Sequence, residues 1–170
     1  MQETRCAYCE ADISSGDRHI EHFRQRSRFP QGTFQWDNLF GSCNRTGTCG
    51  KHKDSCGTYN QQDLIKPDVE DPDKFFLFVT DGTVRVRKGL NAEDKRRAEE
   101  TLRVLNLDAE NGPLRHMRKR VVAGYLQTAE DISNLAQEYS PEEWLPILQA
   151  EIAATSQFPF ATAIRHALIV

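Results

Sequence analysis

An acidic side chain directly precedes a histidine in the segment Arg18-His19-Ile20-Glu21-His22-Phe23-Arg24. Hydrolysis of a phosphodiester needs a base that activates water and a divalent ion that stabilises charge on the leaving oxygen. His22 can supply the base, and Glu21 can ligate the ion. Adjacent residues on a strand point to opposite faces, so one of the two must reach around the edge. A Glu-His pair on a surface strand is usually only solvated, so the pair needs support from its surroundings.

Five cysteines surround this pair in the sequence. Cys6 and Cys9 form a C-x-x-C knuckle, a spacing that lets two thiolates face one tetrahedral zinc ion. Cys43 and Cys49 follow as a second, wider pair, and Cys56 competes with Cys49 for the fourth place. The alternative is a set of unrelated reduced core cysteines. The zinc site is favoured because this hydrophilic, loop-rich segment offers little apolar core to bury them.

Two further segments carry candidate groups. Asn38, in Trp36-Asp37-Asn38-Leu39-Phe40, could hold the preceding loop through hydrogen bonds from its side chain to the backbone. His52 lies just past the second cysteine pair, where a short helix would present it to a metal ion. Both residues therefore join Glu21 and His22 as candidate site residues.

Basic residues alternate immediately after the Glu-His pair, at Arg24, Arg26 and Arg28. On an extended strand they would share one face and could clamp phosphates. The alternative is an ordinary solvated strand edge. Lys51 and Lys53 are also assigned to nucleic-acid contact. A second basic cluster, where a solvated helix face is as plausible as such contact, comprises Arg115, Arg118, Lys119 and Arg120.

The charge of the chain is unevenly distributed. The net charge is −3, yet residues 1–60 hold eight Lys/Arg and seven Asp/Glu, whereas residues 128–170 hold one basic and six acidic residues. The chain is not basic enough to bind nucleic acid by charge alone, and the last quarter is the least suitable part for a phosphate backbone. Without a long apolar run or an apolar N-terminus, we expect a cytoplasmic protein with no membrane contact, in which disulfides are disfavoured.

The hydrophobic pattern predicts an α+β fold. Asp81-Gly82 marks the turn of a β-hairpin over residues 75–86, and Ser140-Pro141-Glu142-Glu143 is a helix start signal. The other predicted helices cover residues 91–107, 114–126, 129–139 and 159–169. We expect a catalytic module at 1–66, a hairpin and basic helices packed on it at 67–127, and acidic helices at 128–170. Those last helices pack on the chain's own helices or dock a partner.

The order and spacing of these motifs resemble the zinc-stapled HNH (ββα-metal) endonucleases. The resemblance rests on Cys6-Ala7-Tyr8-Cys9, Glu21-His22-Phe23-Arg24, Trp36-Asp37-Asn38-Leu39, and Ser42-Cys43 with Cys49-Gly50-Lys51-His52-Lys53. Within that family the chain is most similar to the retron- and Septu-associated anti-phage nucleases called PtuB. The similarity extends from residue 6 to about residue 125.

The resemblance implies a zinc-stapled ββα-metal module with His22 as general base, Asn38 as the central asparagine, and a catalytic magnesium or manganese ion bound by Glu21. Many such modules carry Asn or His directly after the last cysteine, whereas this chain has Gly50, so the closing metal ligand is assigned to His52. The resemblance also implies a nucleic acid substrate, a PtuA-type ATPase partner and, in retron systems, a reverse transcriptase with its RNA–DNA product. Two alternatives stay open: a restriction-type HNH nuclease that acts alone, and a zinc-stapled binding module without catalysis.

Overall fold

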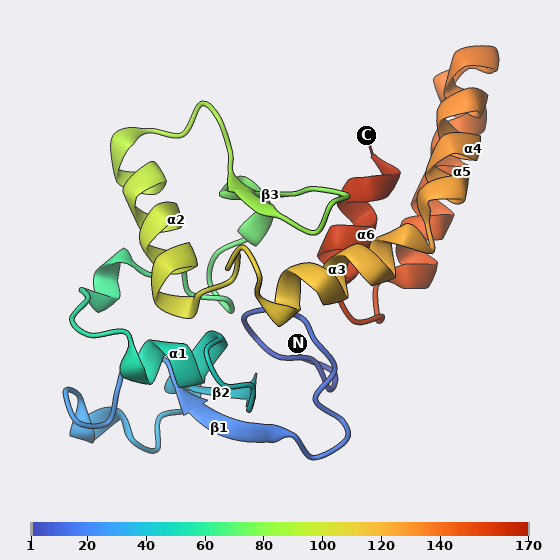
Figure 1. The fold of residues 1–170 in the computed structure, drawn as a ribbon. Helices are drawn as coiled ribbons and strands as arrows, with labels where there is room; N and C mark the ends of the chain where they lie inside the picture. The colour runs from blue at the N-terminus through green and yellow to red at the C-terminus, as the bar shows by residue number, and fades with distance from the viewer. Residues whose placement is uncertain (1, 170) are drawn as a thin grey trace. The chain divides into compact units, whose positions relative to one another are not determined.

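The computed structural model describes residues 2–169 (Figure 1). The described residues form two small antiparallel sheets, in which β1 pairs with β2 and β3 with β4. The elements are β1 (Arg18–His22), β2 (Leu39–Cys43), α1 (Cys49–Ser55), β3 (Phe76–Phe78), β4 (Val84–Val86), α2 (Ala92–Leu105), α3 (Pro113–Ala123), α4 (Leu126–Glu138), α5 (Pro141–Thr155) and α6 (Ala161–Leu168). The predicted mixture of strands and helices, with a hairpin between them, is confirmed.

The chain divides into two compact units. The first comprises Met1–Phe76 and Val86–Asp108, and the second comprises Leu77–Arg85 and Ala109–Val170. These units differ from the three ranges expected from the sequence. Helix α2 belongs to the first unit, while α3 falls in the second unit with the acidic helices α4 and α5.

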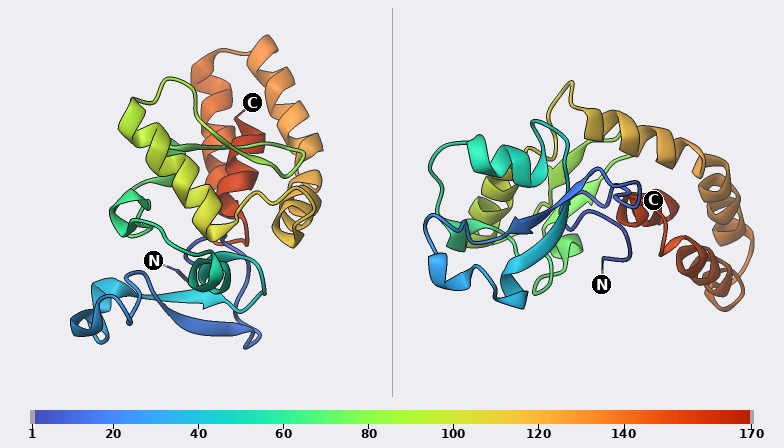
Figure 2. Two further views of the ribbon diagram at one scale, coloured as in Figure 1. Left: turned by 60° about the vertical axis from the view of Figure 1, so that its left-hand side comes forward. Right: turned by 90° about the horizontal axis from the view of Figure 1, so that it is seen from below.

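The first unit is built around the antiparallel pair β1–β2, with α1 against one face (Figure 2). In this pairing Glu21 lies opposite Phe40, and His22 lies opposite Leu39. Helix α1 has seven residues, too few to be stable alone in water. Its place therefore depends on the side chains that tie it to β1, β2 and α2.

Helix α2 closes the apolar core of the first unit. The buried cluster consists of Phe23, Phe40, Leu64 and Val104. Asn91 caps the helix by accepting a hydrogen bond from the Asp94 amide at 2.8 Å, as its position predicted. The core thus joins the β1–β2 pair to a helix more than 50 residues further along the chain.

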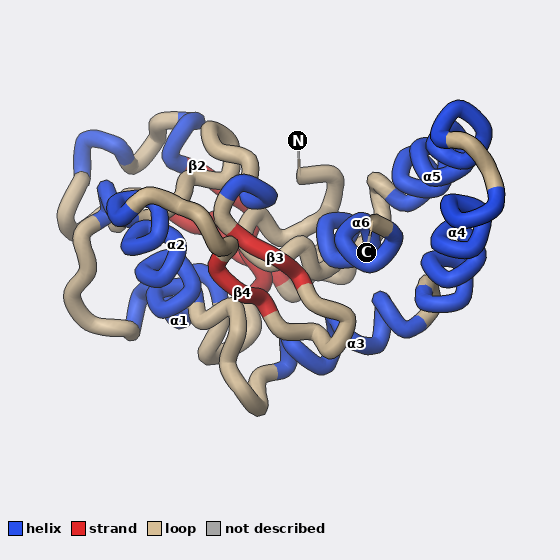
Figure 3. Tube along the Cα trace, turned by 90° about the horizontal axis from the view of Figure 1, so that it is seen from above, coloured by secondary structure: helices blue, strands red, loops and turns tan. Residues whose placement is uncertain are grey.

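The second unit is a helical assembly with the tip of the β3–β4 hairpin (Figure 3). Its core cluster comprises Ile132, Leu148, Ile164 and Leu168. The predicted start of α5 is confirmed by a capping box between Ser140 and Glu143. The acidic helices therefore pack on the chain's own helices. None of the helices within residues 2–169 combines the length and hydropathy needed to cross a bilayer.

Candidate metal centre and catalytic pocket

Four cysteines from three segments meet in the first unit. The Sγ atoms of Cys6, Cys9, Cys43 and Cys49 all lie within 4.8 Å of one another, and all four residues are buried. A Zn–S bond of about 2.3 Å gives a tetrahedron with edges of about 3.8 Å, close to the 4.0 Å between Cys9 and Cys43 Sγ. Cys56 lies outside the cluster, where its thiol donates to the Lys53 carbonyl. The cluster can hold a zinc ion, and Cys49 rather than Cys56 is its fourth member.

The four thiols of this cluster differ in pKa. Hydrogen bonds from Cys49, Cys6 and Cys9 lower the pKa of Cys43 far below that of an ordinary thiol. Cys9 and Cys49 have raised pKa values, chiefly because they donate to Cys43. At Cys6 the hydrogen bond with Cys43 raises the pKa, but those with Cys49 and Cys9 outweigh it, and the resulting pKa is about 7 instead of 9.0. The thiolate is therefore favoured at Cys43 and Cys6, and the thiolate is the form of cysteine that binds a metal ion.

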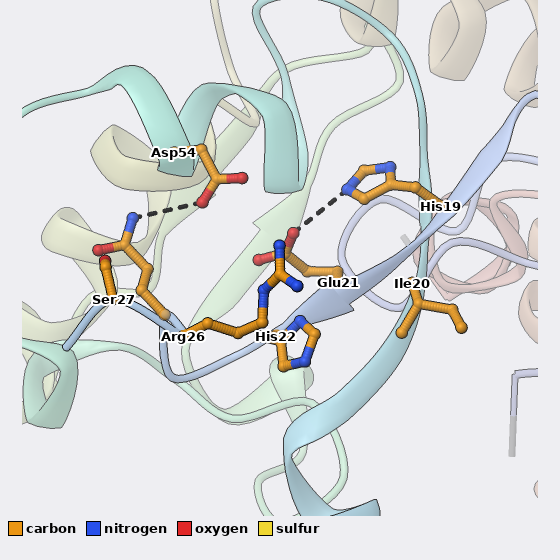
Figure 4. Close-up of a pocket in the computed structure, with 8 residues that line it drawn as sticks. His19, Ile20, Glu21, His22, Arg26, Ser27 and Asp54 are labelled. Carbon is orange, nitrogen blue, oxygen red and sulfur yellow. Dashed lines mark hydrogen bonds and ion pairs between the residues drawn. The ribbon is translucent and has the colours of Figure 1, made fainter. Parts of the chain in front are cut away.

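Glu21 lies on the face of β1 that meets α1, and only 3% of it is exposed. Its Oε1 is 2.5 Å from the Lys53 ammonium, and its Oε2 is 3.2 Å from Nε2 of His19 (Figure 4). Lys53 is also buried, and it donates to the His22 carbonyl at 2.9 Å. A buried ion pair is favourable only when such additional hydrogen bonds complete it. Lys53 therefore fixes the Glu21 carboxylate and the end of β1 at once.

His22 has a ring orientation that suits a base. Its Nε2 lies 3.0 Å from the carbonyl oxygen of Thr33. A carbonyl only accepts, so in the neutral ring Nε2 carries the hydrogen and Nδ1 keeps its lone pair. The protein thus selects the tautomer in which Nδ1 can take a proton.

Asn38 is fully buried and binds the loop between β1 and β2. Its Oδ1 accepts from the Arg24 amide at 2.7 Å, and its Nδ2 donates to the carbonyls of Arg24 and Gly32 at 3.2 and 3.0 Å. Gly32 directly precedes Thr33, the residue that orients His22. The predicted role of Asn38 in holding the preceding loop is confirmed.

A pocket of about 370 Å³ opens beside these groups. Of the described residues, those that line it are His19, Ile20, Glu21, His22, Gln25, Arg26, Ser27 and Asp54. Figure 4 shows His19 directed toward Glu21, with the Arg26 side chain extending into the same region. An imidazole, a carboxylate and a guanidinium therefore border one space, an arrangement that could receive a cation and a phosphate.

His52 is not among the described residues that line this pocket. Its Nδ1 is 2.8 Å from the Val104 carbonyl of α2. Successive helical residues are about 100° apart, so Gly50, Lys53 and Asp54 share one face of α1 while His52 faces away from Gly50. The structure therefore does not bring the expected closing metal ligand to Glu21.

The basic residues assigned to phosphate contact separate in the structure. β1 ends at His22, and the chain turns where the amides of Arg28 and Phe29 bond the Gln25 carbonyl. The expectation that Arg24, Arg26 and Arg28 share one strand face is therefore wrong.

Each of these arginines has its own environment. Arg24 contacts Gln35, Asp37 and the Phe29 ring, whereas Arg28 donates to the Tyr59 carbonyl. Only Arg26 lines the pocket.

The two lysines also differ. Lys51 is exposed on α1, whereas Lys53 is buried against Glu21 and is not available to a phosphate. The pocket contains two chemically useful residues that sequence reasoning left out of the site, His19 and Asp54. The strand period of two would have placed His19 beside Glu21.

A scan against protein-family models finds no match to the chain, and a search of curated proteins finds none either.

Proposed function

We propose that this chain is a metal-dependent endonuclease of the HNH class that cleaves phosphodiester bonds in DNA or RNA. The observation that carries the proposal is the meeting of Glu21 and His22 at one pocket, at the end of β1 in a module with a four-cysteine cluster. Buried Asn38 supports it, because its hydrogen bonds hold the loop that orients His22.

The residues divide the proposed chemistry between them. His22 takes a proton from the attacking water at Nδ1, because Nε2 is committed to the Thr33 carbonyl. Arg26, exposed at the pocket, binds the phosphate that is cut. Glu21 can ligate a divalent ion such as magnesium or manganese, since its Oε2 lies beside the His19 imidazole at the pocket. When bound, such an ion stabilises charge on the phosphate and the leaving oxygen.

A nicking assay on supercoiled plasmid and on single-stranded RNA, with Mg²⁺ or Mn²⁺, tests the proposal. The zinc-loaded chain is expected to cut, and His22→Ala is expected to lose roughly 100-fold or more of the rate. His116→Ala is the matched control, because His116 is exposed on α3. Both variants should retain about one zinc ion per chain. No cutting by the zinc-loaded wild type would support a zinc-stapled binding module, and equal cutting by the wild type and His22→Ala would overturn the role of His22 as the base.

The proposal includes a role as the effector of a retron or Septu anti-phage system, with a PtuA-type ATPase and, in retron systems, a reverse transcriptase with its RNA–DNA product. This part follows from the sequence resemblance. Phage protection in cells that carry the chain with and without a neighbouring ATPase gene tests it. Protection that needs both genes supports it, whereas full cleavage by the chain alone, with no effect of the ATPase, supports a nuclease that acts by itself.

A further inference from the structure

Position 50 of α1 lies against the Glu21 carboxylate with no room for a side chain. A Cβ atom added to Gly50 would lie 2.3 Å from Oε2 of Glu21 and 2.9 Å from Nε2 of His19. Any larger residue would therefore push directly into the two donor atoms. The three heavy atoms nearest to that Cβ position all belong to Glu21 and His19.

His19 is placed on the same side of β1 as Glu21, because the two residues are two apart on a strand. Its Nε2 is 3.2 Å from Glu21 Oε2, the oxygen that Lys53 does not occupy. Within residues 2–169, the other ring nitrogen, Nδ1, has no hydrogen-bond partner. A carboxylate only accepts, so without a cation Nε2 carries the hydrogen and donates it to Oε2 of Glu21. Because Nδ1 has no partner among the described residues, the ring can carry its hydrogen on Nδ1 instead, and Nε2 can then present its lone pair to a cation.

We propose that His19 Nε2 and Glu21 Oε2 together bind the divalent cation, and that Gly50 is required because a side chain there would displace both donor atoms. This inference rests on the proposed nuclease function and replaces His52 as the second ligand. Both cation ligands then lie on β1, whereas the sequence had placed one on β1 and the other, His52, on α1.

The charges around this pair set the affinity and the choice of metal. The Lys53 ammonium, on Oε1, offsets the charge of Glu21, so the free protein binds a cation weakly and a substrate phosphate strengthens the binding. An imidazole donor favours Mn²⁺, Co²⁺ or Ni²⁺ over Mg²⁺, which prefers oxygen ligands. We therefore expect tighter binding of Mn²⁺ than of Mg²⁺.

Electron paramagnetic resonance with Mn²⁺ alone, on the zinc-loaded full chain, tests the inference without any measurement of cleavage. The free Mn²⁺ signal gives the affinity, and electron spin-echo modulation detects a coordinated ¹⁴N. The wild type should show ¹⁴N modulation. His19→Ala should lose it and bind Mn²⁺ about tenfold more weakly or worse. His52→Ala should change neither, because the Nδ1 atom of His52 bonds the Val104 carbonyl.

A change of ligand type separates ligation from general damage. Gly50→Ala should weaken Mn²⁺ binding, since its Cβ would lie 2.3 Å from Oε2 of Glu21 and displace that oxygen. His19→Glu replaces the imidazole with an oxygen ligand at the same position of β1. It should bind Mn²⁺ more tightly than His19→Ala does and still lack ¹⁴N modulation. Recovery of affinity without the nitrogen signal is not expected from a folding defect.

The outcomes distinguish this inference from the proposed function. Persistence of ¹⁴N modulation in His19→Ala with its loss in His52→Ala would overturn the inference. Loss of the modulation in His22→Ala alone would also overturn it. In either case, cleavage that depends on His22 would leave the nuclease proposal intact. Conversely, ¹⁴N modulation that depends on His19 in a chain that cuts no nucleic acid would support the cation site and contradict the nuclease.

Discussion

The two units bury polar groups in different ways. In the first unit the fully buried side chains include Lys53, Asn38, Thr48 and three of the cluster cysteines, and Lys53 is paired with the buried Glu21. In the second unit the central cluster is aliphatic, and its buried cation, Arg118, bonds the backbone carbonyl of Gly82. The first unit thus sequesters a carboxylate and thiols, whereas the second is held mainly by apolar packing.

This difference follows from the size of the elements. Strands of five residues and a helix of seven offer little apolar surface, and small folds of this kind need a metal or another cross-link. Helices of 11 to 15 residues, such as α3, α4 and α5, can bury a continuous apolar face instead. The polar groups that stabilise the first unit also orient its pocket, so stability and proposed chemistry share the same residues.

Zinc removal should have the largest effect, and it should unfold the first unit while the second unit stays folded. Cys43→Ser, or a strong chelator, is expected to abolish hydrogen-exchange protection in β1, β2 and α1, because the cluster binds together segments that lack a large core. Amides in α4 and α6 should keep most of their protection. Cys56→Ser is the control, since Cys56 lies outside the cluster. Equal loss of protection in both units would show that the chain unfolds as one body.

Lys53→Met should be the most damaging single substitution that leaves the cysteines unchanged. It leaves Glu21 buried without its cation and removes the donor to the His22 carbonyl. Breaking a buried pair in this way costs about 3–5 kcal/mol. Exchange at β1 amides should report that loss, and Lys51→Met, on an exposed position of the same helix, should be neutral. A neutral Lys53→Met would mean that the pair does not hold β1 to α1.

Ile164→Ala tests the apolar side of the comparison. Ile164 is completely buried in the core of the second unit, and its truncation should cost about 3 kcal/mol through lost burial and a cavity. Exchange should rise in α4, α5 and α6, while zinc content stays at about one per chain. Ile147→Ala, half exposed on α5, serves as the control. Loss of zinc in Ile164→Ala would contradict separate stabilisation of the two units.

Local sequence signals predicted most of the fold and part of the site. The cap of α2, the capping box of α5, the hairpin and the cysteine quartet follow from short-range patterns and were confirmed. His52 was placed two residues beyond Gly50, and on a helix two residues turn a side chain to the opposite face. A helical projection from Gly50 would have indicated Lys53 and Asp54 instead.

The turn after Phe23 could not be predicted from the residues next to it in the sequence. The segment Arg24-Gln25-Arg26-Ser27-Arg28 contains neither Gly nor Pro, and its alternating arginines favoured a strand. The backbone leaves the sheet there because the amide and the carbonyl of Arg24 are both bound by the side chain of Asn38, 14 residues further on. Such a contact depends on the tertiary fold, and so does the approach of Gly50 to Glu21.

The smallest predicted effect concerns an ion pair between α2 and the segment that joins α1 to β3. Arg97 contacts both Glu70 carboxylate oxygens, at 2.7 and 2.6 Å. Its hydrogen bonds lower the pKa of Glu70 from the ordinary 4.5. Glu70→Gln should cost about 1–2 kcal/mol at pH 7, allowing for partial exposure, as measured by exchange at the amides around residue 66 and in α2. Glu99→Gln, on the exposed side of α2, is the control.

The pH dependence of this ion pair sharpens the contrast with the metal centre. A carboxyl with a lowered pKa contributes fully above its unfolded value and loses that contribution only as the pH falls through the lower folded value. The difference between wild type and Glu70→Gln should therefore be equal at pH 7 and pH 5.5. Zinc affinity should fall over the same interval, because Cys9 and Cys49, with raised pKa values, must release protons to bind it. A Glu70 contribution that shrinks by pH 5.5 would mean that the ion pair acts through the zinc-bound module, not independently of it.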